Sequence, residues 1–327
     1  MKNWKKAGLT ALAGSLVATS AYAGAVTVSG TANLTYAAKS GAEDSSGTSY
    51  ASGTGVGVDG DRWGINKTLS FSGSGEMDNG WTVSTSIEMD NHTAANSDRS
   101  IAIDTGMGKL TFSGEGGSGP IGAWDDVTPT ANEEAHGVAV AGTQTGATSD
   151  SEDSNFFIFD YTAMDNVAIK ASYNPSATTT RIESSHEIGI LYTGVEGLSI
   201  YAATGENNDA GSGSTKDLTN LAVKYTAGSF TIGLQDNEVD SAAANADQEF
   251  SAMGLSYAVS DDLSVSINSS TVDYQQTTLD DQEATGVSIS YTQGGMTVSA
   301  SHSNIDNVAG SSTADNSGYE VNFAFAF

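Results

Sequence analysis

Carboxylates are the side chains of this chain that gather most clearly in one place. Four of them lie in one connector, at Asp125, Asp126, Glu133 and Glu134. No lysine or arginine occurs from residue 110 through residue 169 to neutralise them. Uncompensated carboxylates attract cations and repel anions. A solvated acidic loop and a cation-attracting site both fit this composition, and the surrounding fold must decide between them.

Other acidic groups point less clearly to a ligand. Asp150, Glu152 and Asp153 offer the oxygen ligands that calcium and magnesium prefer. Neither the EF-hand spacing nor a glycine-rich nonapeptide repeat accompanies them. We expect no resident cofactor and no metal site, with calcium or magnesium at the acidic outer loops as the open alternative.

Patterns typical of catalysis are weak. The histidines are isolated in the sequence, at His92, His136, His186 and His302, without the His-x-x-x-His spacing of a metal site. The run 114–119 has the letters of a dinucleotide-binding loop, but the following Pro120 and the acidic surroundings supply neither a helix nor a phosphate-attracting field. A barrel-shaped lipase would need serine and histidine facing lipid at one height, whereas the serines fall chiefly on the inward parity. We therefore expect no enzyme.

The elements that must position these side chains are strands. Sixteen stretches alternate apolar and polar residues, which is the period of a β-strand. They lie at 25–38, 66–75, 81–90, 97–105, 109–115, 155–163, 167–174, 185–193, 198–204, 217–226, 230–236, 248–258, 263–272, 284–292, 296–303 and 318–327.

The connectors between these strands are alternately very short and long. Seven tight connectors are rich in glycine, asparagine and aspartate and suit hairpin turns, while the longest connectors are 39–65 and 116–154. This rhythm predicts an all-β fold, a 16-stranded antiparallel transmembrane β-barrel with short periplasmic turns and long extracellular loops. The same pattern runs without a break over residues 24–327, so we expect one domain.

Composition agrees with an exported membrane barrel. Residues 1–23 have the basic start, apolar stretch and small-x-small end of a signal peptide. The chain has no cysteine, so no disulfide secures it after export. No apolar run approaches the roughly 18 to 20 residues of a membrane-spanning helix, whereas a spanning strand needs only about 10. The net charge of -28 repels nucleic acid.

Aromatic residues favour lipid over water as the environment of the outer face. A set of them lies on the outward parity next to the proposed short turns: Trp81, Tyr161, Tyr192, Tyr225, Tyr257, Tyr291 and Phe327. Such a ring at one height is typical of a membrane interface. Alternation alone also fits a secreted acidic β-sandwich, such as an adhesin or a surface-layer protein, which stays open as the alternative.

The final residues carry the most specific sequence pattern. Tyr319, Val321, Phe323, Phe325 and Phe327 fall on one face of the last strand. This ending resembles the assembly signal of the general porins of Gram-negative outer membranes, most closely those of alphaproteobacteria. The segments 75–88 and 105–114 resemble early strands and tight turns of the same family.

The resemblance implies a function and a site. Porins form water-filled channels for passive diffusion of small hydrophilic solutes and ions across the outer membrane, and they usually assemble as trimers. Their loop after the fifth strand folds inward and narrows the channel. By this resemblance Asp125, Asp126, Glu133 and Glu134 line the constriction, and Trp124 anchors the loop.

Members of this family commonly have a basic cluster on the wall opposite the acidic loop, and this sequence matches that feature poorly. Lys170 is the best inward basic candidate, while Arg62 precedes its strand and Lys67 and Arg99 share the outward parity, which suggests that they snorkel at the outer rim. We therefore expect a cation-preferring pore. The partners implied are outer-membrane lipid and lipopolysaccharide, two further copies of the chain, the outer-membrane insertion machinery and small solutes.

Overall fold

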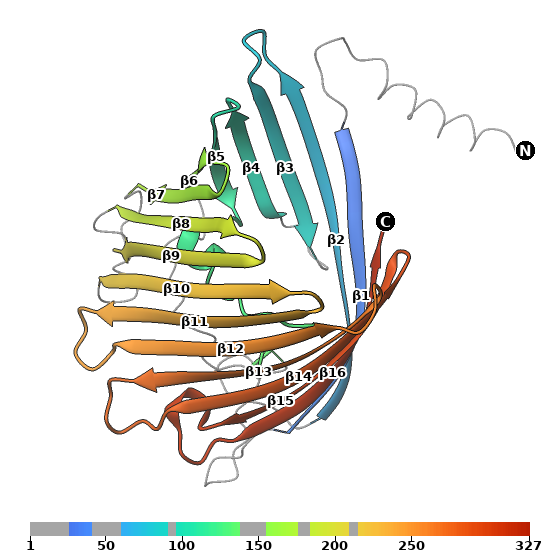
Figure 1. Ribbon diagram of the computed structural model, residues 1–327, viewed down its shortest axis with the longest axis vertical. Coiled ribbons are helices and arrows are strands. Elements are labelled where there is room, and N and C mark those ends of the chain that lie inside the picture. The colour runs from blue at the N-terminus through green and yellow to red at the C-terminus, as the bar shows by residue number, and fades with distance from the viewer. Residues whose placement is uncertain (1–25, 41–59, 91–95, 138–154, 176–183, 209–214) are drawn as a thin grey trace, which may run out of the picture.

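The computed structural model describes residues 26–40, 60–90, 96–137, 155–175, 184–208 and 215–327. Sixteen strands form one closed barrel in this part of the chain (Figure 1). The first eight are β1 (Val26–Ser40), β2 (Gly60–Glu76), β3 (Thr82–Asp90), β4 (Asn96–Asp104), β5 (Gly108–Glu115), β6 (Phe156–Met164), β7 (Val167–Asn174) and β8 (Ser185–Val195). The other eight are β9 (Leu198–Asn207), β10 (Lys216–Ala227), β11 (Phe230–Ser241), β12 (Gln248–Ala258), β13 (Leu263–Tyr274), β14 (Gln282–Gln293), β15 (Met296–Asp306) and β16 (Asn316–Ala326).

The strands follow one another around the ring in sequence order, and β1 closes the ring against β16. At the closure Leu34 lies opposite Phe323. The backbones of Gly30 and Phe327 exchange two hydrogen bonds, with N···O distances of 2.9 and 3.0 Å. Closure gives the two terminal strands partners for their backbone groups, as a membrane requires. The predicted 16-stranded antiparallel barrel is confirmed.

Alternation along each strand places apolar side chains outside and polar ones inside. In β14, Val287 and Ile289 point outward with 52% and 44% of their surface exposed, whereas Ser288 between them is 6% exposed. A soluble protein buries such aliphatic side chains. The exposed apolar exterior is that of a barrel that spans a membrane.

Several strands are longer than the alternation predicts. β2 begins at Gly60 rather than residue 66, so Arg62 lies within this strand and does not precede it. β11 continues to Ser241 rather than ending at residue 236, because its backbone ladder extends past the apolar positions, where Asp217 faces Asp240. Hydrogen bonding of the backbone does not depend on side-chain hydropathy. Strand pairing can therefore continue beyond the last residue of the apolar and polar alternation.

The tight turns have the backbone that their composition predicts. Gly80 and Gly106 have φ angles of 81° and 78°, a conformation that glycine adopts without strain. β3 begins at Thr82, one residue later than predicted, because the N–H of Met77 donates to the carbonyl of Trp81 across the turn at 2.7 Å.

Helical structure is slight. The described residues contain α2 (Pro120–Ala123) and the short 3-10 helix η2 (Val308–Gly310). Neither these nor any other helix of the described residues has the length and apolar character to cross a membrane. The predicted signal peptide, residues 1–23, lies outside the described residues.

Candidate functional site

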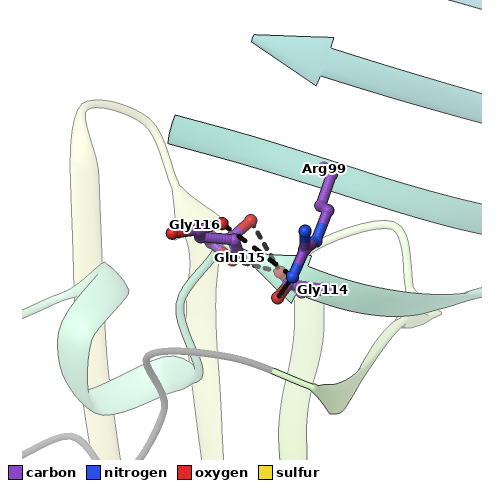
Figure 2. A network of polar contacts seen from close by, with 5 residues as sticks. Arg99, Gly114, Glu115 and Gly116 are labelled. Carbon is purple, nitrogen blue, oxygen red and sulfur yellow. Dashed lines mark hydrogen bonds and ion pairs between the residues drawn. The ribbon is translucent and has the colours of Figure 1, made fainter. Parts of the chain in front are cut away.

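The loop after β5 leaves the barrel wall at a local irregularity. The pairing of β4 and β5 shifts between Arg99 and Ser100, and Gly116 and Gly117 have φ angles of 65° and 91°. The guanidinium of Arg99 donates to the carbonyl of Gly114 at 3.2 Å and lies 3.9 Å from the carboxylate of Glu115 (Figure 2). Both charged side chains are about half exposed, so the ion pair contributes little. The backbone turn rather than the charge directs the loop inward.

The first turn of the loop is anchored by α2 on the inner wall. Ile121 is 1% exposed, and its N–H donates to the buried carboxylate of Glu187 on β8 at 3.0 Å. The ring of Trp124 packs edge-on against Tyr201 of β9, with centroids 5.7 Å apart. Trp124 therefore anchors the loop against the wall, as predicted.

Side-chain amides of β10 and β11 then hold the loop backbone. The carbonyl of Trp124 accepts from Asn220 at 2.5 Å and from Gln235 at 3.0 Å. The carbonyl of Asp125 accepts from Asn237 at 3.0 Å and also from Gln235. Gln235 in addition accepts from the N–H of Val127 at 2.8 Å. One buried glutamine thus satisfies three backbone groups of the loop.

Hydroxyls and one amide continue this attachment across β13, β14 and β15. Asn268 donates to the carbonyl of Pro129 at 2.9 Å, and the N–H of Ala131 donates to Ser266 at 2.9 Å. Asn132 donates through its side chain to Ser301 at 2.8 Å. The loop therefore runs from β8 to β15 along the inside of the wall, where Figure 1 shows it in green within the ring of strands. The predicted inward fold of this loop is confirmed.

Two of the predicted carboxylates meet on this loop. The side chains of Asp126 and Glu134 are close enough to affect each other's charge. Crowding by protein atoms and the nearby carboxylates of Glu134 and Asp125 raise the pKa of Asp126 to about 8. The side chain nevertheless stays open to lumen water on part of its surface. Neighbouring carboxylates disfavour the charged form of one another, so Asp126 gives the loop a titratable charge at its inner face.

The neighbouring side chains of the loop are less exposed. Asp125 and Glu133 are half-buried, and the Asp125 backbone is fixed by the amides of β11. His136 is 7% exposed and meets the ring of Phe250 edge-on at 6.0 Å. Burial lowers the pKa of His136, while the charge of Glu134 opposes this shift.

Lys170 lies on the inward face of β7, but within the described residues its ion-pair partner is not a loop carboxylate. Its ammonium contacts Asp160 of β6 at 3.1 Å, with side chains 20% and 44% exposed. Asp160 also lies opposite Lys109 of β5, so charges of both signs alternate along this part of the wall. The prediction that Lys170 belongs to the constriction stays a prediction.

The outer face carries the predicted aromatic set. Trp81, Tyr161, Tyr192, Tyr225, Tyr257, Tyr291 and Phe327 are all exposed beside the short turns. Among the residues of the C-terminal pattern, Tyr319, Phe325 and Phe327 are exposed and Val321 and Phe323 are half-buried. Their roles as girdle and assembly signal stay predictions.

No group of three or more histidine, aspartate and glutamate side chains that could hold a metal ion occurs in the described ranges. The acids considered for calcium, Asp150, Glu152 and Asp153, lie outside those ranges, as does His92. His186 and His302 are exposed on the outward faces of β8 and β15.

Comparison with known proteins identifies a family to which this chain is similar. A family model described as Gram-negative porin matches residues 8–291, which is most of the chain. No curated protein sequence matches the chain.

Solved structures are similar in fold at low sequence identity. Outer-membrane expressed OmpT of Vibrio cholerae superposes with a TM-score of 0.67 at 14% identity, over 94% of this chain and 99% of that one. The trimer form of the same Vibrio cholerae protein gives 0.65 at 14% identity, over 92% and 99%. A variant of Rh. blastica porin gives 0.64 at 16% identity, over 92% and 100%. At these identities the likeness shows the fold.

Proposed function

Because this chain belongs to the Gram-negative porin family, we propose that it is a cation-preferring diffusion channel of the outer membrane, permeable to small hydrophilic solutes and ions. The observation that carries this proposal is the loop after β5, which is fastened to the inner wall of a closed barrel from β8 to β15. A barrel of sixteen strands is too wide for wall side chains to fill, so a loop inside it narrows the bore without plugging it. The channel has no catalytic role.

The charges of the lumen support cation preference. Asp126 and Glu134 lie together on the loop, and in the described residues no lysine or arginine forms an ion pair with them. The inward Lys170 is already neutralised by Asp160. Carboxylates that face an aqueous bore raise the local concentration of cations, especially where the protein wall excludes solvent.

The orientation and partners follow from the same fold. The short turns face the periplasm and the long loops face outward, as is usual for such barrels. The aromatic residues beside the short turns contact the lipid interface. A homotrimer is supported by the trimer form of the Vibrio cholerae protein that shares this fold. The aromatic C-terminus is read by the insertion machinery, and the long loops contact lipopolysaccharide.

Single-channel recording in a planar bilayer with a KCl gradient tests the function. The purified mature protein is expected to produce discrete conductance steps and a zero-current potential of the cation-selective sign. Heat-modifiable migration on a gel shows that each sample contains folded barrel. A protein that is folded by this criterion but produces no steps and leaves liposomes impermeable to small sugars contradicts the proposal. Solubility without detergent favours the adhesin alternative.

Matched neutral substitutions test the role of the loop carboxylates. The double variant Asp126→Asn, Glu134→Gln is expected to lose part of the cation preference. Its control is Glu238→Gln, Glu249→Gln, which removes the same number of carboxylates from facing positions on the outside of β11 and β12. An equal effect of the two double variants contradicts a role for the loop.

A further inference from the structure

Four glycines of the barrel wall lie directly beneath the inner loop. We call them the glycine seat: Gly189 of β8, Gly233 of β11, Gly254 of β12 and Gly286 of β14. A methyl group added to Gly233 would lie 2.5 Å from Cδ of Pro129, and one added to Gly286 would lie 2.8 Å from Cα of Ala135. Carbon atoms that are not bonded to each other do not approach so closely, so the loop fits against the wall only because these positions have no side chain.

Three members of the glycine seat lie under proline or tryptophan side chains of the loop. A Cβ on Gly189 would lie 2.7 Å from Cβ of Pro120 and would also collide with the ring of Trp124. Gly233 and Gly254 face each other on adjacent strands, and both are covered by Pro129. The described part of the loop therefore contacts the seat at its first turn, at its middle and close to its last residues.

Backbone conformation does not account for these glycines. None of the four has the positive φ angle that favours glycine, and each lies inside a regular strand. Glycine in the interior of a strand is destabilising, and it often marks the close approach of another backbone. What glycine provides here is space for the loop.

We propose that the glycine seat sets the bore of the channel, its four members acting as positioning residues for the loop. This inference rests on the proposed channel function. The wall beneath each glycine is held by ladder hydrogen bonds to a strand on either side, whereas the loop is open to the lumen on its other face. A side chain added at the seat therefore displaces the loop toward the pore axis and narrows the passage.

The test compares seat variants with a matched glycine of the same wall. Gly64 of β2 is also on the inward parity, opposite Thr35, and a Cβ added there meets nothing within 4 Å. Gly254→Leu is expected to lower single-channel conductance by at least about twofold and to exclude the larger of a series of sugars in liposome swelling. Gly64→Leu is expected to conduct within experimental error of the wild type, since a Cβ there meets none of the described residues of the loop within 4 Å.

A rescue variant separates loop position from general damage. Gly233→Ala is expected to lower conductance, because its methyl group meets the ring of Pro129. Combining it with Pro129→Ala removes the ring atom Cδ that it meets and is expected to restore conductance toward that of Pro129→Ala alone. A merely structural defect in β11 is not repaired by shortening a side chain of the loop. Heat-modifiable migration confirms that every variant contains folded barrel.

The possible results separate the role of the glycine seat from the proposed channel function. Lower conductance in folded seat variants, absent in Gly64→Leu and reversed by the Pro129 substitution, supports the inference. Equal conductance of seat and control variants overturns it, and so does increased conductance, which means that the loop is released rather than displaced. If the wild type itself forms no channel, the proposed function fails instead, and the two failures are distinguishable.

Discussion

The raised pKa of Asp126 beside Glu134 predicts that cation selectivity rises with pH in the neutral to alkaline range. With a pKa of about 8, Asp126 holds its proton in roughly nine of ten molecules at pH 7 and in roughly one of ten at pH 9. The raised pKa means that the carboxyl is neutral below this range and charged above it. The loop thus gains about 0.8 of a negative charge between pH 7 and pH 9.

The size of the effect follows from Coulomb's law. A monovalent cation passing about 5 Å from the new charge in water gains about 0.8 kcal/mol, which salt at 0.1 M screens to about 0.5 kcal/mol. The dielectric constant of water is appropriate because part of the Asp126 side chain stays open to the lumen. This energy enriches cations at the constriction by about twofold.

The assay is the zero-current potential of single channels across a KCl gradient, recorded from pH 6.5 to pH 9.5. The wild type is expected to become more cation-selective, with a midpoint near pH 8. Asp126→Asn abolishes the change. Glu134→Gln removes a negative charge that helps to raise the pKa of Asp126, so it lowers this pKa and moves the change to lower pH. His136 does not interfere, because burial lowers its pKa and keeps the ring neutral in this range. A flat profile in the wild type, or an unchanged step in Asp126→Asn, refutes the reasoning.

Further expected outcomes concern the wall, the loop anchor and the C-terminus. Lys170→Gln leaves Asp160 without its ion-pair partner and increases cation preference at pH 7, measured as the same zero-current potential; a shift of the anion-selective sign contradicts this. Gln235→Ala removes the acceptor of the Val127 N–H, whereas the carbonyls of Trp124 and Asp125 keep Asn220 and Asn237 as donors. The lost partner costs about 1 to 3 kcal/mol where water does not replace it, and faster amide exchange of Val127 with an unchanged barrel measures it. Deleting Phe327 removes the two backbone hydrogen bonds that it exchanges with Gly30 at one end of the barrel closure and lowers the yield of heat-modifiable barrel, whereas an equal yield argues against an assembly role.

The strands could be predicted because their side-chain alternation is the direct result of a lipid exterior and a wet lumen. All sixteen lie where the pattern places them. The error at the end of β11 occurs where that cause ends. In β11 the outward positions become Asp236, Glu238 and Asp240, so the apolar pattern stops while the ladder continues to Ser241. The alternation of apolar and polar residues depends on the environment of the side chains. The length of a strand also depends on hydrogen bonding to the adjacent strands.

The candidate site was predictable in part. The resemblance predicts an inward loop bearing carboxylates, but nothing in the sequence distinguishes Gln235 and Glu187 from the other polar residues of the lumen. Their importance comes from register and from the path of the loop, which involve strands far apart in sequence. The same limit applies to Lys170, whose partner Asp160 is determined by the pairing of β6 with β7. One readable signal was missed, since glycines inside strands at Gly233 and Gly254 indicate that another backbone passes close by.

The pairing of β1 with β16 has a consequence for biogenesis. The ring lacks its last seam until the final residues of the chain are in place, so a barrel folded without β16 would present the unpaired backbone edge of β1. Such an edge recruits any other extended chain that it meets. The backbone groups of the first strand are therefore fully paired only when the last strand has joined it, so closure of the ring couples the two ends of the chain.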